Sequence, residues 1–156
     1  ADCDYAQTEL ATRRSSEAWA AQGVRAVDGK VLPAFAEASV LAPAGARGPA
    51  FLVGRNYRAI LRYNNATSYA LAVGTLARRV AGEPGIRADW PRQETPLSRS
   101  QVRTLQRALN ARGFGTGTPD GIIGPNTRAG LRAYQASQGL TPDGFATVSL
   151  LERLQQ

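Results

Sequence analysis

Residues 115–144 read GTGTPDGIIGPNTRAGLRAYQASQGLTPDG, and the tetrapeptide Thr-Pro-Asp-Gly occurs in them twice, at 118–121 and at 141–144. Proline fixes one backbone angle, aspartate accepts hydrogen bonds from nearby amides, and glycine adopts positive φ, so each copy predicts a tight turn. Each copy follows a helical stretch that ends at a glycine, and each precedes another helical stretch. Two such helix-plus-turn units predict a compact helical bundle.

Helix signals on either side of the repeat extend this bundle. Ser98 is predicted to cap a first helix, with Gln101 completing a capping box, and Pro125 suits the first turn of a second helix. A third, short helix follows the second turn. Apolar residues recur at helical spacing in all three helices, and the expected core consists of Leu105, Leu109, Leu131, Tyr134 and Leu151.

The sequence before the bundle divides into two further parts. Residues 83–96 contain three prolines and no apolar period, which is typical of a linker. We therefore predict one domain at 1–82, the linker at 83–96 and the helical bundle at 97–156.

Residues 1–82 are expected to be mainly α-helical with a short β pair. The Asp-Gly within 27–31 predicts a β-hairpin, and strands are expected at 39–41 and 51–53. Helices are predicted from Ser15 to Gly23, at 56–63 and at 67–81. The last of these helices carries apolar residues at spacings of four, three and four, which predict one buried stripe: Tyr69, Val73, Leu76 and Val80.

The composition limits the classes of function. A formal net charge of +7 favours anionic partners, but no basic run with interleaved aromatic residues predicts a nucleic-acid groove. Cys3 is the only cysteine and histidine is absent, so we expect no metal site, no cofactor and no histidine-activated nucleophile. No apolar run is long enough for a membrane span, and Ala1-Asp2 does not resemble the start of a signal peptide.

The bundle carries an ordered series of residues: Val102, Leu105-Gln106, Leu109, Gly113, Asp120-Gly121, Gly124, Thr127, Leu131, Tyr134-Gln135, Gly139-Leu140 and Asp143-Gly144. With this series the bundle resembles the type 1 peptidoglycan-binding domain. The resemblance implies binding to glycan strands and stem peptides of the bacterial cell wall. We expect the turn that begins at Asp120 to shape a shallow cleft, in which Asp120, Asn126 and Arg128 supply hydrogen bonds. Arg128 would hold a peptide carboxylate.

Residues 1–82 contain a second series of short motifs: Glu37-Ala38-Ser39, the loop 43–51, Asn56-Tyr57-Arg58-Ala59-Ile60, Tyr63-Asn64-Asn65 and Ser68-Tyr69-Ala70. With these motifs, residues 1–82 resemble the closing portion of lytic transglycosylases of the membrane-bound lytic transglycosylase B type. The resemblance implies the C-terminal fragment of a lysozyme-like domain. Tyr63 and Asn64 are expected on the wall of the glycan groove. Asn56, Ser68 and Tyr69 are weaker candidates, and of these Tyr69 is expected in the core because it lies on the apolar stripe.

In that family one glutamate, on a helix upstream of the matched portion, acts as acid and then as base. The bond between N-acetylmuramic acid and N-acetylglucosamine is broken without water, leaving 1,6-anhydromuropeptides. Glu9, Glu17 and Glu37 do not match the catalytic context, so we expect the chain alone to be inactive and its parent to be a periplasmic transglycosylase.

Two other functions remain open from the sequence. The first is a stand-alone, non-catalytic protein that binds or anchors to peptidoglycan. The second is a basic nucleic-acid binder, which the charge permits but no motif supports. Without its upstream half, a transglycosylase portion should expose an apolar face that packs on the missing segment or on a second copy.

Overall fold

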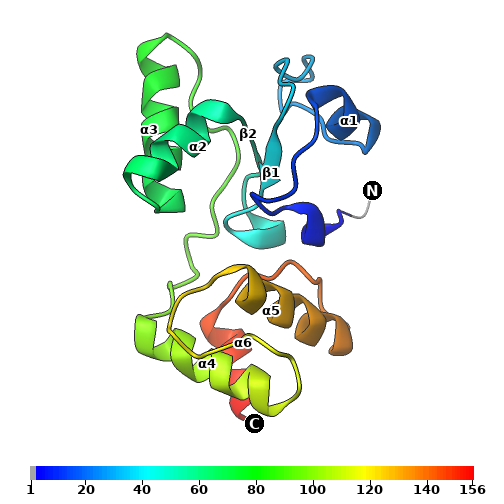
Figure 1. Ribbon diagram of the computed structural model, residues 1–156, viewed down its shortest axis with the longest axis vertical. Coiled ribbons are helices and arrows are strands. Elements are labelled where there is room, and N and C mark those ends of the chain that lie inside the picture. The colour runs from blue at the N-terminus through cyan, green and yellow to red at the C-terminus, as the bar shows by residue number, and fades with distance from the viewer. Residues whose placement is uncertain (1–2) are drawn as a thin grey trace. The chain divides into compact units, whose positions relative to one another are not determined.

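The computed structural model describes residues 3–156, so the expectation about Ala1-Asp2 lies outside the described residues. Contacts divide the chain into two compact units. The first unit comprises residues 1–43 and 49–89, and the second comprises residues 44–48 and 90–156. Figure 1 shows the helices and strands of each unit.

The first unit is helical with one small sheet, as the sequence predicts. Its elements are η1 (Tyr5–Gln7), α1 (Ser16–Ala21), β1 (Ser39–Leu41), β2 (Phe51–Val53), α2 (Arg55–Tyr63) and α3 (Thr67–Val80). The two strands pair antiparallel, with Ser39 opposite Val53. The side chain of Ser15 caps α1 by accepting a hydrogen bond from the Ala18 amide.

The core of the first unit consists of two small apolar clusters. In one cluster, Trp19 is buried against the sheet region, and its indole N–H donates to the Ala38 carbonyl at 2.9 Å. In the other, Tyr57 of α2 and Ala70 of α3 are buried together with Leu41. The second cluster fixes the angle between α2 and α3, because both helices contribute a buried residue to it.

The predicted β-hairpin at 27–31 is wrong. The Asp-Gly pair does form a turn, in which the Lys30 amide donates to the Asp28 carboxylate at 3.1 Å and Gly29 has φ +74°. No strand flanks this turn in the described part of the chain, since Val27 and Val31 are 79% and 95% exposed. The turn chemistry is local, whereas strands need a buried face to pack.

The predicted buried stripe of α3 is also wrong. Leu76 and Val80 are 65% and 82% exposed, and Tyr69 is 37% exposed. The buried residue of α3 is Ala70, whose small side chain permits close approach to α2. The spacing is that of an amphipathic helix, but the apolar face of α3 is turned away from the core of its own unit.

The second unit contains a three-helix bundle, as predicted. Its elements are η2 (Gly45–Arg47), α4 (Arg99–Ala111), α5 (Pro125–Ser137) and α6 (Val148–Gln155). The capping box at Ser98 and Gln101 is present, and Pro125 occupies the first turn of α5. All five residues expected in the core are buried, and Ala146, Leu150 and Leu154 complete the cluster.

The two Thr-Pro-Asp-Gly turns are held by the same arrangement of hydrogen bonds. Gln106, on α4, accepts from the Gly121 amide at 2.9 Å and donates to the Asp120 carboxylate at 3.0 Å. A second glutamine, Gln135 on α5, accepts from the Gly144 amide at 2.8 Å and donates to the second turn's aspartate at 2.7 Å. Each turn is therefore fixed to the helix before it by one glutamine.

None of the helices in residues 3–156 has both the length and the apolar character that a membrane crossing requires.

Candidate functional site

The corner between α2 and α3 brings several of the predicted glycan-binding residues together. Helix α2 ends at Tyr63, and the Asn64 amide donates to the Ile60 carbonyl at 3.0 Å. One residue later, the Ala66 amide donates to the Asn64 carbonyl at 2.8 Å, which turns the chain into α3. Tyr57, about two turns earlier on α2, is buried against Ala70 of α3, and burial raises the pKa of its hydroxyl.

An open pair of aromatic rings lies at this corner. Tyr63 is 85% exposed, and its ring centroid lies 6.3 Å from that of Tyr69, with 33° between the ring planes. The expectation that Tyr69 belongs to the core is therefore wrong, because its ring is partly open and contacts Tyr63. Exposed tyrosine rings can stack on the apolar face of a sugar and hydrogen-bond through their hydroxyls.

The other candidates of the first unit are also accessible to a ligand. Asn64 and Ser68 are exposed, and they stand next to the two tyrosines in the sequence. Asn56 is exposed on the first turn of α2, seven residues before Tyr63, so it shares a helix face with Tyr63 but lies about two turns away. Amide and hydroxyl groups at these positions can bond to hydroxyl or N-acetyl groups.

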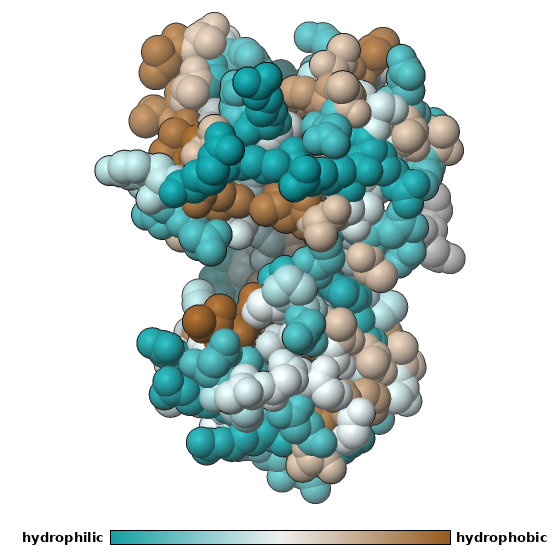
Figure 2. Space-filling model, viewed as in Figure 1, coloured by the Kyte–Doolittle hydropathy of each residue, from teal (hydrophilic) through white to brown (hydrophobic). Residues whose placement is uncertain are grey.

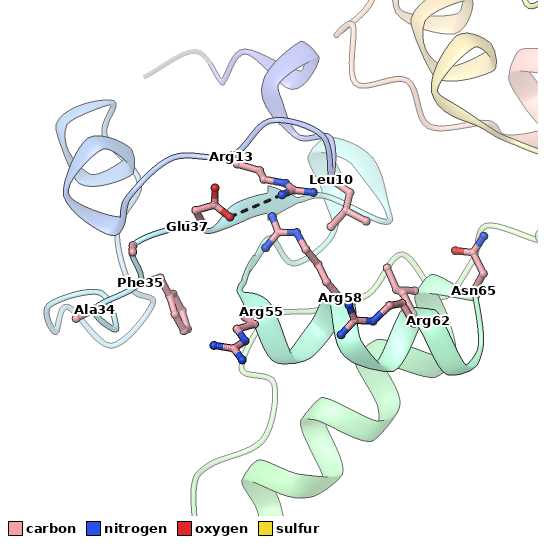
Figure 3. Close-up of a pocket in the computed structure, with 11 residues that line it drawn as sticks. Leu10, Arg13, Ala34, Phe35, Glu37, Arg55, Arg58, Arg62 and Asn65 are labelled. Carbon is pink, nitrogen blue, oxygen red and sulfur yellow. Dashed lines mark ion pairs between the residues drawn. The ribbon is translucent and has the colours of Figure 1, made fainter.

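A second feature of this unit, an arginine-rich groove, was not predicted from the sequence. It has a volume of about 870 Å³ and lies between the loop 34–37 and α2 (Figure 3). Its charged lining residues are Arg13, Glu37, Arg55, Arg58 and Arg62. The three arginines of α2 are spaced by three and four residues. This spacing places them on one face of a helix, so the sequence could have indicated this side of the groove.

The candidate site of the second unit is the first Thr-Pro-Asp-Gly turn. Asp120 Oδ1 accepts from the Gln106 side chain at 3.0 Å and from the Ile122 amide at 2.8 Å. These two hydrogen bonds, from the Gln106 side chain first and the Ile122 amide second, hold the pKa of the Asp120 carboxyl below its usual value. Oδ2 makes no hydrogen bond within residues 3–156, so it can accept one from a ligand.

The other two candidates of this unit differ in their surroundings. Asn126 is exposed on the first turn of α5. Arg128 is partly buried, and its Nη1 donates to the Ile123 carbonyl at 3.0 Å. Its guanidinium therefore helps to hold the 120–128 segment in place. In the part of the chain that the structure describes, no cluster of carboxylate, histidine or cysteine groups is suited to a metal ion.

The chain belongs to the transglycosylase SLT domain family, which matches residues 1–78. The putative peptidoglycan binding domain family matches residues 98–154. Both resemblances inferred from the sequence motifs are thereby confirmed. Among curated proteins the comparison gives no match.

Solved structures of SltB3 from Pseudomonas aeruginosa are similar to the whole chain. The crystal structure in complex with NAG-anhNAM-pentapeptide matches with a TM-score of 0.94 and 50% identity, over 100% of this chain and 42% of the SltB3 chain. The complex with NAG-NAM-pentapeptide matches with a TM-score of 0.93 and 50% identity, over 99% of this chain and again 42% of the other. The present chain thus spans less than half the length of SltB3.

Proposed function

We propose that this chain is the glycan-groove wall and the wall-binding module of a lytic transglycosylase in the bacterial periplasm. The observation that carries the proposal is the 50% identity, over the whole chain, to SltB3 structures that hold peptidoglycan fragments. In this proposal the second unit binds peptidoglycan and keeps the first unit close to its polymer. Both families that match the chain are related to the cell wall, which supports this division of labour.

In the first unit, the aromatic pair and its polar neighbours would contact the glycan. Tyr63 stacks on a sugar face, and Asn64 offers its amide to an N-acetyl or hydroxyl group. Ser68 and Asn56 add hydrogen bonds at either side. Tyr69 joins them as a second stacking surface, because its ring is partly exposed beside Tyr63.

In the second unit, the turn after α4 would contact glycan or stem peptide. The free oxygen of Asp120 accepts a ligand N–H or O–H, and Asn126 donates or accepts from the start of α5. Arg128 orients the segment through its bond to the Ile123 carbonyl, and a guanidinium at this place is the group type that binds a peptide carboxylate. Because Gln106 fixes the turn beforehand, binding does not have to order this backbone.

The catalytic acid of the parent enzyme would be supplied from a segment outside these 156 residues. SltB3 is longer than this chain, which corresponds to 42% of its length. The exposed apolar surface of α3, formed by Leu76, Val80 and Tyr69, would pack on that segment (Figure 2 shows hydrophobic surface over the α3 region). A self-dimer through this surface is the other outcome, and light scattering at rising protein concentration tests for it.

The binding role is tested by depletion of the chain from solution by purified sacculi. We expect saturable binding, and we expect Asn126→Ala to weaken it by about threefold or more through the loss of one hydrogen-bonding group. Gln138→Ala, at an exposed position of the same unit, is the matched control and should bind as the parent does. Absence of sacculus binding by the parent chain would overturn the proposal.

The division between binding and catalysis is tested by incubating sacculi with the chain alone. We expect no release of anhydromuropeptides, as analysed by mass spectrometry. Release of these products by the isolated 156 residues would show that the catalytic acid lies within them, and it would contradict this part of the proposal.

A further inference from the structure

The arginine-rich groove of the first unit carries a strong excess of positive charge. Four guanidinium groups line it, from Arg13, Arg55, Arg58 and Arg62, whereas Glu37 is the one carboxylate among its lining residues. Glu37 pairs with Arg13 at 3.7 Å, and both side chains are more than half exposed. An ion pair of this kind is weak, since water screens it, so it leaves most of the charge of the groove uncompensated.

The arginines of α2 are available to a ligand. Arg55, Arg58 and Arg62 share one face of the helix and extend over about 10 Å of its axis. Within residues 3–156, the guanidinium groups of Arg55 and Arg62 make no hydrogen bond or ion pair. Three cations along one groove wall repel one another, and an anionic ligand would relieve this repulsion.

Arg58 is the least solvated of the three. Its Nη2 donates to the Ser39 hydroxyl at 2.7 Å, while its Nε is buried and has no hydrogen-bond partner among the described residues. Burial, and then the neighbouring charge of Arg13, lower the pKa of Arg58 against the opposing effect of Glu37. Figure 3 shows the Arg13 and Arg58 guanidinium groups directed toward one another. A guanidinium remains charged in a protein, so Arg13 and Arg58 are two neighbouring cations that share the single carboxylate of Glu37.

We infer that this groove binds the carboxylate groups of a peptide, and, if the proposed function holds, that this peptide is the stem peptide of peptidoglycan. Guanidinium groups spaced along two turns of helix suit several separate carboxylates better than one compact phosphate. The groove is also lined by Leu10, Phe35 and Leu61, which suit the short aliphatic side chains of such a peptide. In this assignment the groove binds the peptide, and the aromatic corner of Tyr63 and Tyr69 binds the sugar.

The test is an NMR titration of the isotope-labelled 156-residue chain with a synthetic stem pentapeptide that carries no sugar. We expect the Nε–H signals of Arg55, Arg58 and Arg62 to shift, and we expect the pentapeptide with amidated carboxyl groups to leave them unchanged. The double substitution Arg55→Gln and Arg62→Gln should weaken binding by about tenfold or more. Arg79→Gln with Arg87→Gln removes the same charge at exposed positions of the same unit and should change affinity less than about twofold.

Several results of this titration would contradict the inference. Shifts confined to residues 97–156, equal affinity for the amidated peptide, or shifts with inorganic phosphate but not with the peptide would overturn the assignment of the groove. A parent chain that binds sacculi but leaves these arginine signals unmoved refutes the groove and spares the proposed function. A parent chain that binds neither sacculi nor peptide counts against both.

Discussion

The three-helix bundle and the α2–α3 pair use similar amphipathic helices in opposite ways. In the bundle, the apolar faces of α4, α5 and α6 meet, and Leu105, Leu109 and Leu131 are fully buried. In the pair, Leu76 and Val80 of α3 stay exposed, and the one residue that α3 buries, Ala70, packs in a small cluster with Tyr57 of α2. An amphipathic pattern therefore indicates that a helix needs a partner surface, but it does not indicate that the same unit provides that surface.

Removal of one leucine from each region should affect stability very differently. We expect Leu105→Ala to lower the free energy of unfolding by about 4 kcal/mol, because it leaves a cavity in a closed core. The matched change Leu76→Ala should cost less than about 0.5 kcal/mol, because its side chain is 65% exposed. Amide hydrogen exchange, read separately for α4 and for α3, measures both. Equal losses would mean that α3 is buried in solution.

A second prediction concerns the polar part of the bundle. Gln106 is 1% exposed and fixes the first turn to α4. We expect Gln106→Ala to destabilise the bundle by roughly 2 kcal/mol, since it leaves the partly buried Gly121 amide and the buried Thr127 hydroxyl with fewer partners. Gln138→Ala, an exposed glutamine at the end of α5, should change stability by less than about 0.5 kcal/mol. Urea unfolding followed by NMR of the bundle signals compares the two, and similar midpoints would contradict the role given to Gln106.

Local chemistry explains what the sequence allowed us to predict. The capping box at Ser98, Pro125 at the start of α5 and the two Asp-Gly turns all form as expected, because each depends on residues a few positions apart. The strand pair at 39–41 and 51–53 is also confirmed, with the predicted boundaries. The sequence marked Gln106 and Gln135 only as positions that match the family. Their role in holding the turns was not predicted, because each bonds to residues in a later loop.

Two features could not be predicted from the sequence, because they depend on contacts between residues that are distant in the chain. The spacing of Tyr69, Leu76 and Val80 predicted a buried face, but burial depends on what packs against the helix, and Ala70 faces α2 instead. The arginine-rich groove needs residues from α2 and from the separate segments around Arg13 and Glu37, which only the fold brings together. Among the candidate glycan-binding residues, Tyr63, Asn64 and Ser68 do lie at one corner, whereas Asn56 stands about two turns away along α2.

A smaller effect is expected at acid pH, where protonation of Asp120 should lower the stability of the bundle. Its folded pKa lies below the ordinary 3.8, because the Gln106 side chain and the Ile122 amide favour the charged carboxylate. The resulting stabilisation is therefore complete above about pH 4 and is lost as the pH falls through the lower, folded value. Asp120→Asn should remove this part of the acid decline, and Asp89→Asn, an exposed aspartate outside the bundle, should retain it. The measurement is the urea midpoint of the bundle at several pH values between about pH 6 and about pH 2.5. If the midpoint of the Asp120→Asn variant falls with pH as steeply as that of the parent, the stabilisation by these hydrogen bonds does not depend on the charge of Asp120.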